Sequence, residues 1–153
     1  MERNTDSGKE GKYRNFIDCD AHPLAPYGLE VDEHLPGGWI KFNPARIGLW
    51  FTQNQLGHGL YKELENNRIL NANVLDWLIA NPHHILKEWK GAAFCGTIYR
   101  DILGMRHVRY LRRRFFFFGA WCSGSRLLCC FWNKTHPVAI LTSRTTPYLY
   151  LVR

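Results

Sequence analysis

The segment Leu70–Arg100 constrains the fold most, because it contains a helix signal, a proline that ends the helix and a strand signal in close succession. An amphipathic helix places apolar residues three and four positions apart. The residues that follow this spacing are Val74, Leu75, Trp77, Leu78 and Ile79. Asn71 or Asn73 is a suitable N-cap, and Pro82 disfavours helical backbone in the residue before it. We therefore predict a helix over Asn73–Ala80.

A second short helix and a strand are predicted after this proline. Pro82 suits the first position of a new helix, and Ile85 and Trp89 would lie on one side of it. The predicted helix covers Pro82–Lys90, and the aromatic and β-branched residues of Ala92–Tyr99 favour a strand. The residues expected in the core are Trp77, Leu78, Trp89, Phe94 and Ile98.

The C-terminal half is interpreted as further strands of a small antiparallel sheet built mainly from residues 92–141. Arg106–Leu111 alternates basic and apolar residues, whereas Leu127–Trp132 and Val138–Leu141 are largely apolar. A glycine between two serines favours a hairpin turn at Ser123–Ser125. These segments supply the sheet on which the helical pair is expected to pack.

The N-terminal part is less regular. Residues 1–15 are charged and are expected to form a disordered tail. Prolines and glycines then separate short apolar pieces, which predicts an irregular N-terminal lobe. Brief strands are expected within it at Leu29–Leu35, Trp39–Phe42 and Ile47–Thr52. At 153 residues the chain is long enough to bury a core. We predict that residues 16–153 form a single domain of the α+β class, with a short helical pair packed on a small antiparallel β-sheet.

Several quoted motifs carry a resemblance to a known family. The central pattern is LNANVLDWLIANP…EWKG…GTIYRD, the opening segment is FIDCDAHPLAPYGLEVDEHLPGGWIKFNPARIGLW, and the closing segment is HPVAILTS. Together they resemble a family of small uncharacterised bacterial proteins with no established activity. The resemblance extends from Phe16 to Ser143, and it implies no particular reaction, cofactor or partner.

The chain departs from the family pattern between Ile102 and Phe131. This stretch has no acidic residue and is rich in arginine and cysteine, whereas the family pattern has a turn and then strands that alternate Tyr and Trp. Two compensating frameshifts would produce such a stretch between matching flanks. We therefore treat a frameshifted segment at residues 102–131 as a hypothesis, which translation of the coding DNA in its other frames tests.

Composition and motif content exclude several classes of protein. Hydrophobic residues make up 46% of the chain, which excludes global disorder, and no apolar run is long enough to span a bilayer. The N-terminal residues lack the apolar core of a secretory signal, so a cytoplasmic location is expected. The five cysteines are an odd number without a C-x-x-C pair, so neither a disulfide framework nor a zinc site is predicted. No nucleotide-binding or hydrolase motif is present, and no cofactor is predicted.

Charge is unevenly distributed along the chain. All 13 Asp and Glu residues lie in residues 1–101, whereas residues 102–153 contain nine of the 20 Lys and Arg residues and no acidic one. A segment of one charge sign favours a polyanionic partner. We therefore expect a non-enzymatic binding protein whose basic half contacts nucleic acid or another polyanion, with no membrane partner. The residues expected to make this contact are Arg106, Arg109, Arg112, Arg113 and Arg114, with Tyr110 available for stacking on bases.

The arginines of this cluster also have a structural interpretation. Basic side chains also keep the edge strand of a soluble sheet solvated.

An alternative function is a metal-dependent phosphoesterase-type hydrolase, because Asp18 and Asp20 form a D-x-D pair that can supply a nucleophile and an acid/base group. The strand before this pair is short, so a turn role for both carboxylates is the competing interpretation. His22 lies near the pair, but no metal site is predicted.

Overall fold

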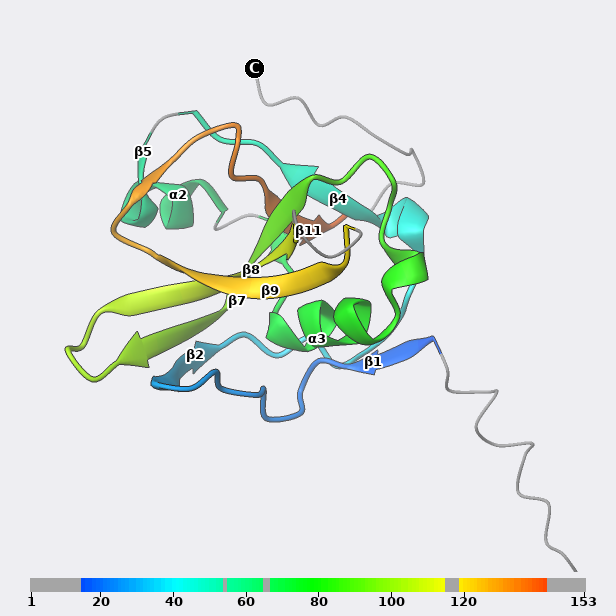
Figure 1. The fold of residues 1–153 in the computed structure, drawn as a ribbon, viewed down its shortest axis with the longest axis horizontal. Coiled ribbons are helices and arrows are strands. Elements are labelled where there is room, and N and C mark those ends of the chain that lie inside the picture. The colour runs from blue at the N-terminus through cyan, green and yellow to red at the C-terminus, as the bar shows by residue number, and fades with distance from the viewer. Residues whose placement is uncertain (1–14, 54, 65–66, 115–118, 143–153) are drawn as a thin grey trace, which may run out of the picture.

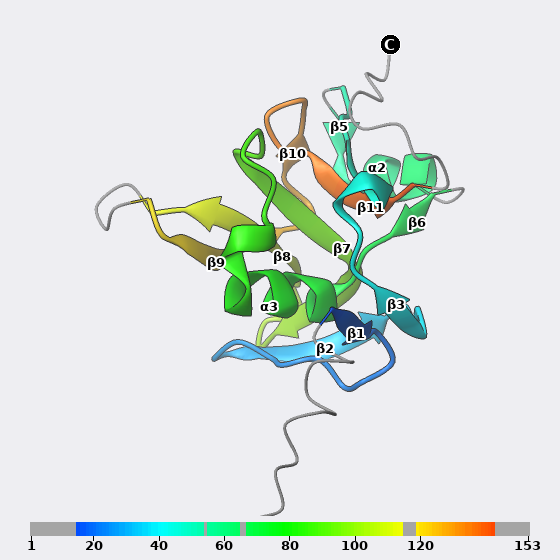
Figure 2. The same ribbon diagram turned by 90° about the vertical axis from the view of Figure 1, so that its right-hand side faces the viewer.

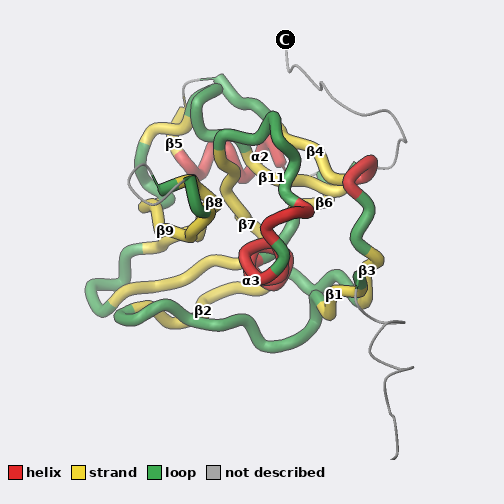
Figure 3. Tube along the Cα trace, turned by 45° about the vertical axis from the view of Figure 1, so that its right-hand side comes forward, coloured by secondary structure: helices red, strands yellow, loops and turns green. Residues whose placement is uncertain are grey.

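A computed structural model describes residues 15–53, 55–64, 67–114 and 119–142, without the side chain of His58. Strands make up 43% of the structure, so the fold is mostly β (Figures 1 and 3). The strands are β1 (Phe16–Asp18), β2 (Leu29–His34), β3 (Trp39–Lys41), β4 (Ile47–Trp50), β5 (Gln55–Leu56), β6 (Arg68–Ile69), β7 (Gly91–Asp101), β8 (Arg106–Arg113), β9 (Trp121–Leu127), β10 (Phe131–Trp132) and β11 (Val138–Leu141). The helices are α2 (Gly57–Leu64), α3 (Ala72–Ala80) and the short 3-10 helices η1 (Pro44–Arg46) and η2 (Pro82–His84). The expected tail, residues 1–15, lies outside the described residues apart from Asn15.

A seven-stranded mixed sheet forms the centre of the molecule. Its main order is β4-β11-β7-β8-β9, while β2 also pairs with β7 and β6 pairs with β11. β11 runs parallel to β7, with Val138 opposite Ala93, and the other pairings are antiparallel. β1 pairs with β3 and β5 pairs with β10 in two separate small sheets.

The long strand β7 separates two hydrophobic clusters. Phe94 packs in one cluster with Val74 and Leu78 of α3, whereas its neighbour Cys95 belongs to a second cluster with Leu60 of α2. Successive residues of a strand point to opposite faces, so α3 and α2 cover opposite faces of the sheet (Figure 2). Burial on both faces accounts for the almost continuous apolar sequence of β7.

The helix predicted at Asn73–Ala80 is confirmed, because α3 covers Ala72–Ala80. Asn71 is its N-cap, and its Oδ1 accepts from the backbone N–H of Asn73 at 3.1 Å. The same side chain donates from Nδ2 to the carbonyl oxygens of Cys19 and Leu35, at 2.9 and 3.0 Å. One residue therefore starts the helix and attaches it to two N-terminal segments.

The helix predicted over Pro82–Lys90 is wrong. Only the 3-10 turn η2 forms, and Ile85 returns to extended backbone with φ −72° and ψ 128°. Ile85 and Trp89 are nevertheless buried in the same cluster as α3. The apolar spacing therefore indicated which side chains are buried, but a turn followed by a coil buries them as well as a helix would.

The predicted α+β class, with a helical pair on a small antiparallel sheet, is also wrong. The short strands expected in the N-terminal lobe do form, as β2, β3 and β4. The lobe is not separate, however, because β2 and β4 join the central sheet, where they pair with β7 and β11. The parallel pairing of β11 with β7 makes that sheet mixed. β2 and β4 are four to six residues long, and only their partners far along the chain stabilise them.

Two local predictions in the C-terminal half are also wrong, because pairing between strands overrides the local sequence signal. The hairpin turn expected at Ser123–Ser125 lies inside β9, and the strand expected at Leu127–Trp132 is divided between the last residue of β9 and the two-residue strand β10. A Cβ atom on Gly124 would lie 2.6 Å from the ring of Tyr110 on the neighbouring strand. Glycine at this position therefore leaves room for an aromatic ring and does not form a turn.

The expected core residues are largely confirmed. Leu78, Trp89, Phe94 and Ile98 are buried, whereas Trp77 is only partly buried. Within the described parts of the chain, no helix has both the length and the apolar character needed to cross a membrane.

Candidate functional site

The five arginines expected to contact a polyanion do not form one surface. Arg106, at the start of β8, is ion-paired with β2: its Nε lies 3.3 Å from Asp32 and its Nη2 lies 2.9 Å from Glu33. These carboxylates neutralise the charge that a polyanion would meet at that end of the strand.

Arg109 is buried and connects the sheet to α3. Its guanidinium donates to both carboxylate oxygens of Asp76, at 2.8 and 3.1 Å, and to Ser123 Oγ at 3.1 Å. Only 8% of the Arg109 side chain is exposed. This geometry is that of a structural ion pair between β8 and α3, so Arg109 does not present its charge to a surface ligand.

At the C-terminal end of β8, neighbouring arginines lie on opposite faces of the sheet. Arg112 lies beside the Tyr110 ring, with its guanidinium carbon 5.7 Å from the ring centroid, and Arg113 lies on the other face, 4.7 Å from the Trp121 ring. Arg114 follows the strand, and its backbone N–H donates to Ala120 at 2.8 Å. The aromatic run at residues 115–118 lies outside the described residues.

Arg112 and Tyr110 line a pocket of about 250 Å³, called here the basic pocket. Its cationic residues come from three segments of the chain, and none of the described residues that line it is Asp or Glu. The lining residues that determine its chemistry are Lys90, Tyr110, Arg112, Arg126, Trp132 and His136. Part of the basic cluster predicted from sequence therefore contributes to a pocket, together with side chains that are distant in sequence.

The pairing of β8 with β9 positions the first of these groups. Tyr110 is opposite Gly124, and Val108 is opposite Arg126. Because alternate residues share a face, Tyr110, Arg112 and Arg126 lie on the same side of the sheet. The absent side chain of Gly124 provides the space that the Tyr110 ring occupies.

Trp132 holds Arg126 in place. The guanidinium carbon of Arg126 lies 5.3 Å from the centroid of the Trp132 ring, and its Nη2 donates to the carbonyl of Phe131 at 2.7 Å. Trp132 is fully buried, so its ring supports the arginine and is not available for stacking on a ligand. The Nε of Arg126 is buried without a hydrogen-bond partner among the described residues.

His136 completes the pocket from the turn that precedes β11. Its Nδ1 lies 3.1 Å from Asn133 Oδ1, and its ring centroid lies 6.1 Å from that of Trp132. Burial, and then the positive charge of Arg126, lower the pKa of His136 below its ordinary value of 6.5. The imidazole is therefore mainly neutral at pH 7, and the charge of the pocket comes from Lys90, Arg112 and Arg126.

The carboxylates of the alternative function lie at the end of β1, which holds Asp18, and in the turn that follows it, which holds Asp20. Asp18 Oδ1 accepts from the backbone N–H of Asp20 at 3.1 Å. Asp20 Oδ1 accepts from the N–H groups of Gly37 and Gly38, at 3.1 and 3.0 Å. Both carboxylates therefore act as acceptors for backbone N–H groups, Asp18 within its own turn and Asp20 for the segment that precedes β3. Across the described chain, no group of three or more His, Cys, Asp or Glu side chains is placed to hold a metal ion.

Four residues of the basic pocket were not among the residues predicted from sequence: Lys90, Arg126, Trp132 and His136. Arg126 and His136 belong to the half of the chain that lacks acidic residues, so charge distribution was a partial signal for them. Lys90 lies outside that half. No local pattern relates these residues to Arg112, because turns and sheet pairing bring them together.

Comparison with known proteins finds no matching family model, no matching curated protein and no matching solved structure. The resemblance to a family of small bacterial proteins therefore stays a prediction. The functional argument depends on the geometry of the basic pocket.

Proposed function

We propose that this protein is a non-enzymatic binding protein whose basic pocket accepts a short stretch of single-stranded nucleic acid. The observation that supports it is the convergence of Lys90, Arg112 and Arg126 on one pocket whose described lining contains no acidic residue. Cationic side chains neutralise phosphates and release their counterions, which provides most of the affinity for a nucleic acid.

The shape of the pocket favours a single strand over a duplex. Its volume of about 250 Å³ is below the range of roughly 300–1,000 Å³ that is usual for drug-sized ligands, so it accepts no more than one unit of a strand at a time. Tyr110 is the partly exposed aromatic ring of the pocket, and it lies beside Arg112. An unpaired base can stack on such a ring, whereas the bases of a duplex are already stacked on each other.

Binding to a fluorescently labelled oligothymidylate is expected to weaken steeply as salt concentration rises. Fluorescence anisotropy measures this at several salt concentrations. The single variant Arg112→Gln and the double variant Lys90→Gln/Arg112→Gln are expected to bind more weakly and to reduce the slope of log K against log salt by about 0.7 for each phosphate contact removed.

Arg113→Gln is the matched control for this experiment. It removes the same charge from the residue next to Arg112, but from the opposite face of β8. It is expected to leave affinity and salt slope nearly unchanged. Undetectable binding of the wild-type protein at low salt, or an equal loss in Arg113→Gln and Arg112→Gln, contradicts the proposal.

The affinity is also expected to rise as the pH falls through the lowered pKa of His136, below 6.5. A bound phosphate favours the protonated imidazole, so ligand binding and proton uptake strengthen each other. The groups that face His136 are Arg126, Trp132, Asn133 and Thr135. His136→Gln is expected to abolish the gain seen between pH 7 and pH 5 while retaining the affinity measured at pH 7. A pH profile identical to that of the wild type contradicts a role for His136.

A further inference from the structure

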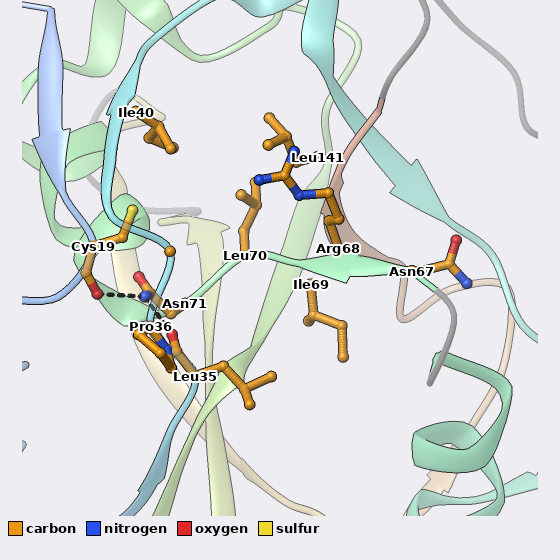
Figure 4. A pocket seen from close by; sticks show the side chains of 11 residues that line it. Cys19, Leu35, Pro36, Ile40, Asn67, Arg68, Ile69, Leu70, Asn71 and Leu141 are labelled. Carbon is orange, nitrogen blue, oxygen red and sulfur yellow. Dashed lines mark hydrogen bonds between the residues drawn. The ribbon is translucent and has the colours of Figure 1, made fainter.

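A second pocket, of about 220 Å³, lies beside β6 and shares no lining residue with the basic pocket. We call it the β6 pocket (Figure 4). Its apolar walls come from four separate segments, represented by Leu35, Ile40, Leu70 and Leu141. Arg68 is the one formally charged residue among the described residues that line it.

The guanidinium of Arg68 has no partner among the described residues. Figure 4 shows the side chains of Arg68 and Leu70 on one side of β6 and that of Ile69 on the other, with the end of Arg68 close to Leu141. Arg68 is exposed, and its guanidinium forms no hydrogen bond or ion pair with any described residue, while its backbone pairs with Leu141 of β11. Among the described residues, the other arginines of the sheet pair with carboxylates, carbonyls or rings, so Arg68 differs in having no described partner for its charge beside an apolar space.

The end of the pocket at Cys19 has the opposite character. Burial, and then the charges of Asp20 and Asp18, raise the pKa of the Cys19 thiol to about 11, so this thiol is neutral. Asn71 adds no free amide donor, because its Nδ2 is already bonded to the carbonyls of Cys19 and Leu35. The carboxylate of Asp20, bound to Gly37 N–H at the wall, disfavours an anion at this end.

We propose that the β6 pocket binds a small monocarboxylate with an apolar chain. The carboxylate pairs with the guanidinium of Arg68, and the chain lies toward Ile40 and Cys19. A guanidinium offers two parallel N–H donors, which match the two oxygens of one carboxylate. The apolar walls remove the chain from water, and the charge difference between the two ends sets the orientation of the ligand.

Octanoate and octanol are suitable probes, because they share a chain and differ at the head group. The full chain is expected to bind octanoate in a calorimetric or NMR titration, with chemical-shift changes at the methyl groups of Leu70 and Leu141. Octanol is expected to bind about tenfold more weakly or worse, because its head group cannot form the charged pair.

Arg68→Gln is expected to weaken octanoate binding about tenfold or more and to leave octanol binding unchanged. The variant is expected to keep the fold, because the guanidinium of Arg68 has no partner among the described residues and the backbone pairing with β11 does not need the side chain. Lys87→Gln is the matched control, since Lys87 is exposed and does not line either pocket. Equal affinity of octanoate for the wild type and Arg68→Gln, or equal affinity of the wild type for both probes, overturns the proposal.

This inference is independent of the proposed nucleic-acid function. Oligothymidylate binding is expected to be the same with and without saturating octanoate, and the same in Arg68→Gln as in the wild type. The variant Lys90→Gln/Arg112→Gln is expected to lose oligonucleotide binding and to retain octanoate binding. This result would show that the two ligands bind at different sites. Displacement of octanoate by the oligonucleotide would show that both occupy one site, and it would overturn the β6 proposal.

Discussion

Asp76→Asn is expected to lower the free energy of unfolding by about 3–5 kcal/mol, measured by urea denaturation. The change removes the anion that neutralises Arg109, whose side chain is only 8% exposed. The guanidinium would then remain in the protein interior with an amide as its neighbour. Removing one partner of a buried ion pair is costly mainly because the other charge stays desolvated.

The two partners of this pair are expected to contribute unequally. Asp76 is 26% exposed, so water can solvate its carboxylate when Arg109 is absent. Arg109→Met is therefore expected to cost less than Asp76→Asn, and the double variant is expected to be more stable than Asp76→Asn alone. Asp32→Asn is the control, because its partners Arg100 and Arg106 are 52% and 39% exposed and such surface pairs contribute about 0–1 kcal/mol each. Equal losses for Asp76→Asn and Asp32→Asn contradict this account.

Leu78→Ala is expected to lower the free energy of unfolding by about 2–5 kcal/mol. Leu78 is 1% exposed and packs in the cluster that joins α3 to Phe94 of β7 and Leu111 of β8. Its truncation removes apolar contacts and leaves a cavity, because the surrounding strands cannot collapse freely. Thermal or urea unfolding of the variant measures the loss.

Leu103→Ala provides the matched control for Leu78→Ala. Leu103 is 84% exposed in the turn between β7 and β8, so the same deletion is expected to change stability by no more than about 0.5 kcal/mol. A loss below that limit for Leu78→Ala would show that α3 presents a different face to the sheet.

The segment of unusual composition, residues 102–131, supplies β8 and β9. Val108 and Leu111 are fully buried there, and the two strands pair in continuous register from His107 to Arg113. The frameshift hypothesis for this segment stays a prediction that the coding DNA tests. The stability experiments on Asp76 and Arg109 examine one contact that the segment makes with α3.

Several elements were predictable from local sequence. The apolar spacing and the residues Asn71 and Pro82 define where α3 begins and ends, because capping and proline geometry act over a few residues. The aromatic and β-branched residues of β7 and the apolar residues of β11 indicated strands for a similar reason. Burial of Leu78, Trp89, Phe94 and Ile98 followed from the same patterns.

The candidate site was predictable only in part. An acid-free, arginine-rich half of the chain indicated a polyanion partner, and Tyr110 and Arg112 do line the basic pocket. Arg109 has the same side chain as Arg112 and lies three residues away, yet it is buried against Asp76. Sequence alone does not distinguish these two arginines, because strand alternation shows that they occupy opposite faces but not which face α3 covers.

By itself, the sequence determined the local elements and the charge balance of this protein: α3, the apolar strand β7 and the basic C-terminal half. Only the tertiary structure decided that β2 and β4 join the central sheet, that Gly124 lies within a strand, and that Lys90 and His136 meet Arg112 at one pocket. Helix caps and residue periodicity depend on interactions across a few residues. Strand pairing and pocket assembly depend on contacts between distant segments, and their energies are set by packing in the complete fold.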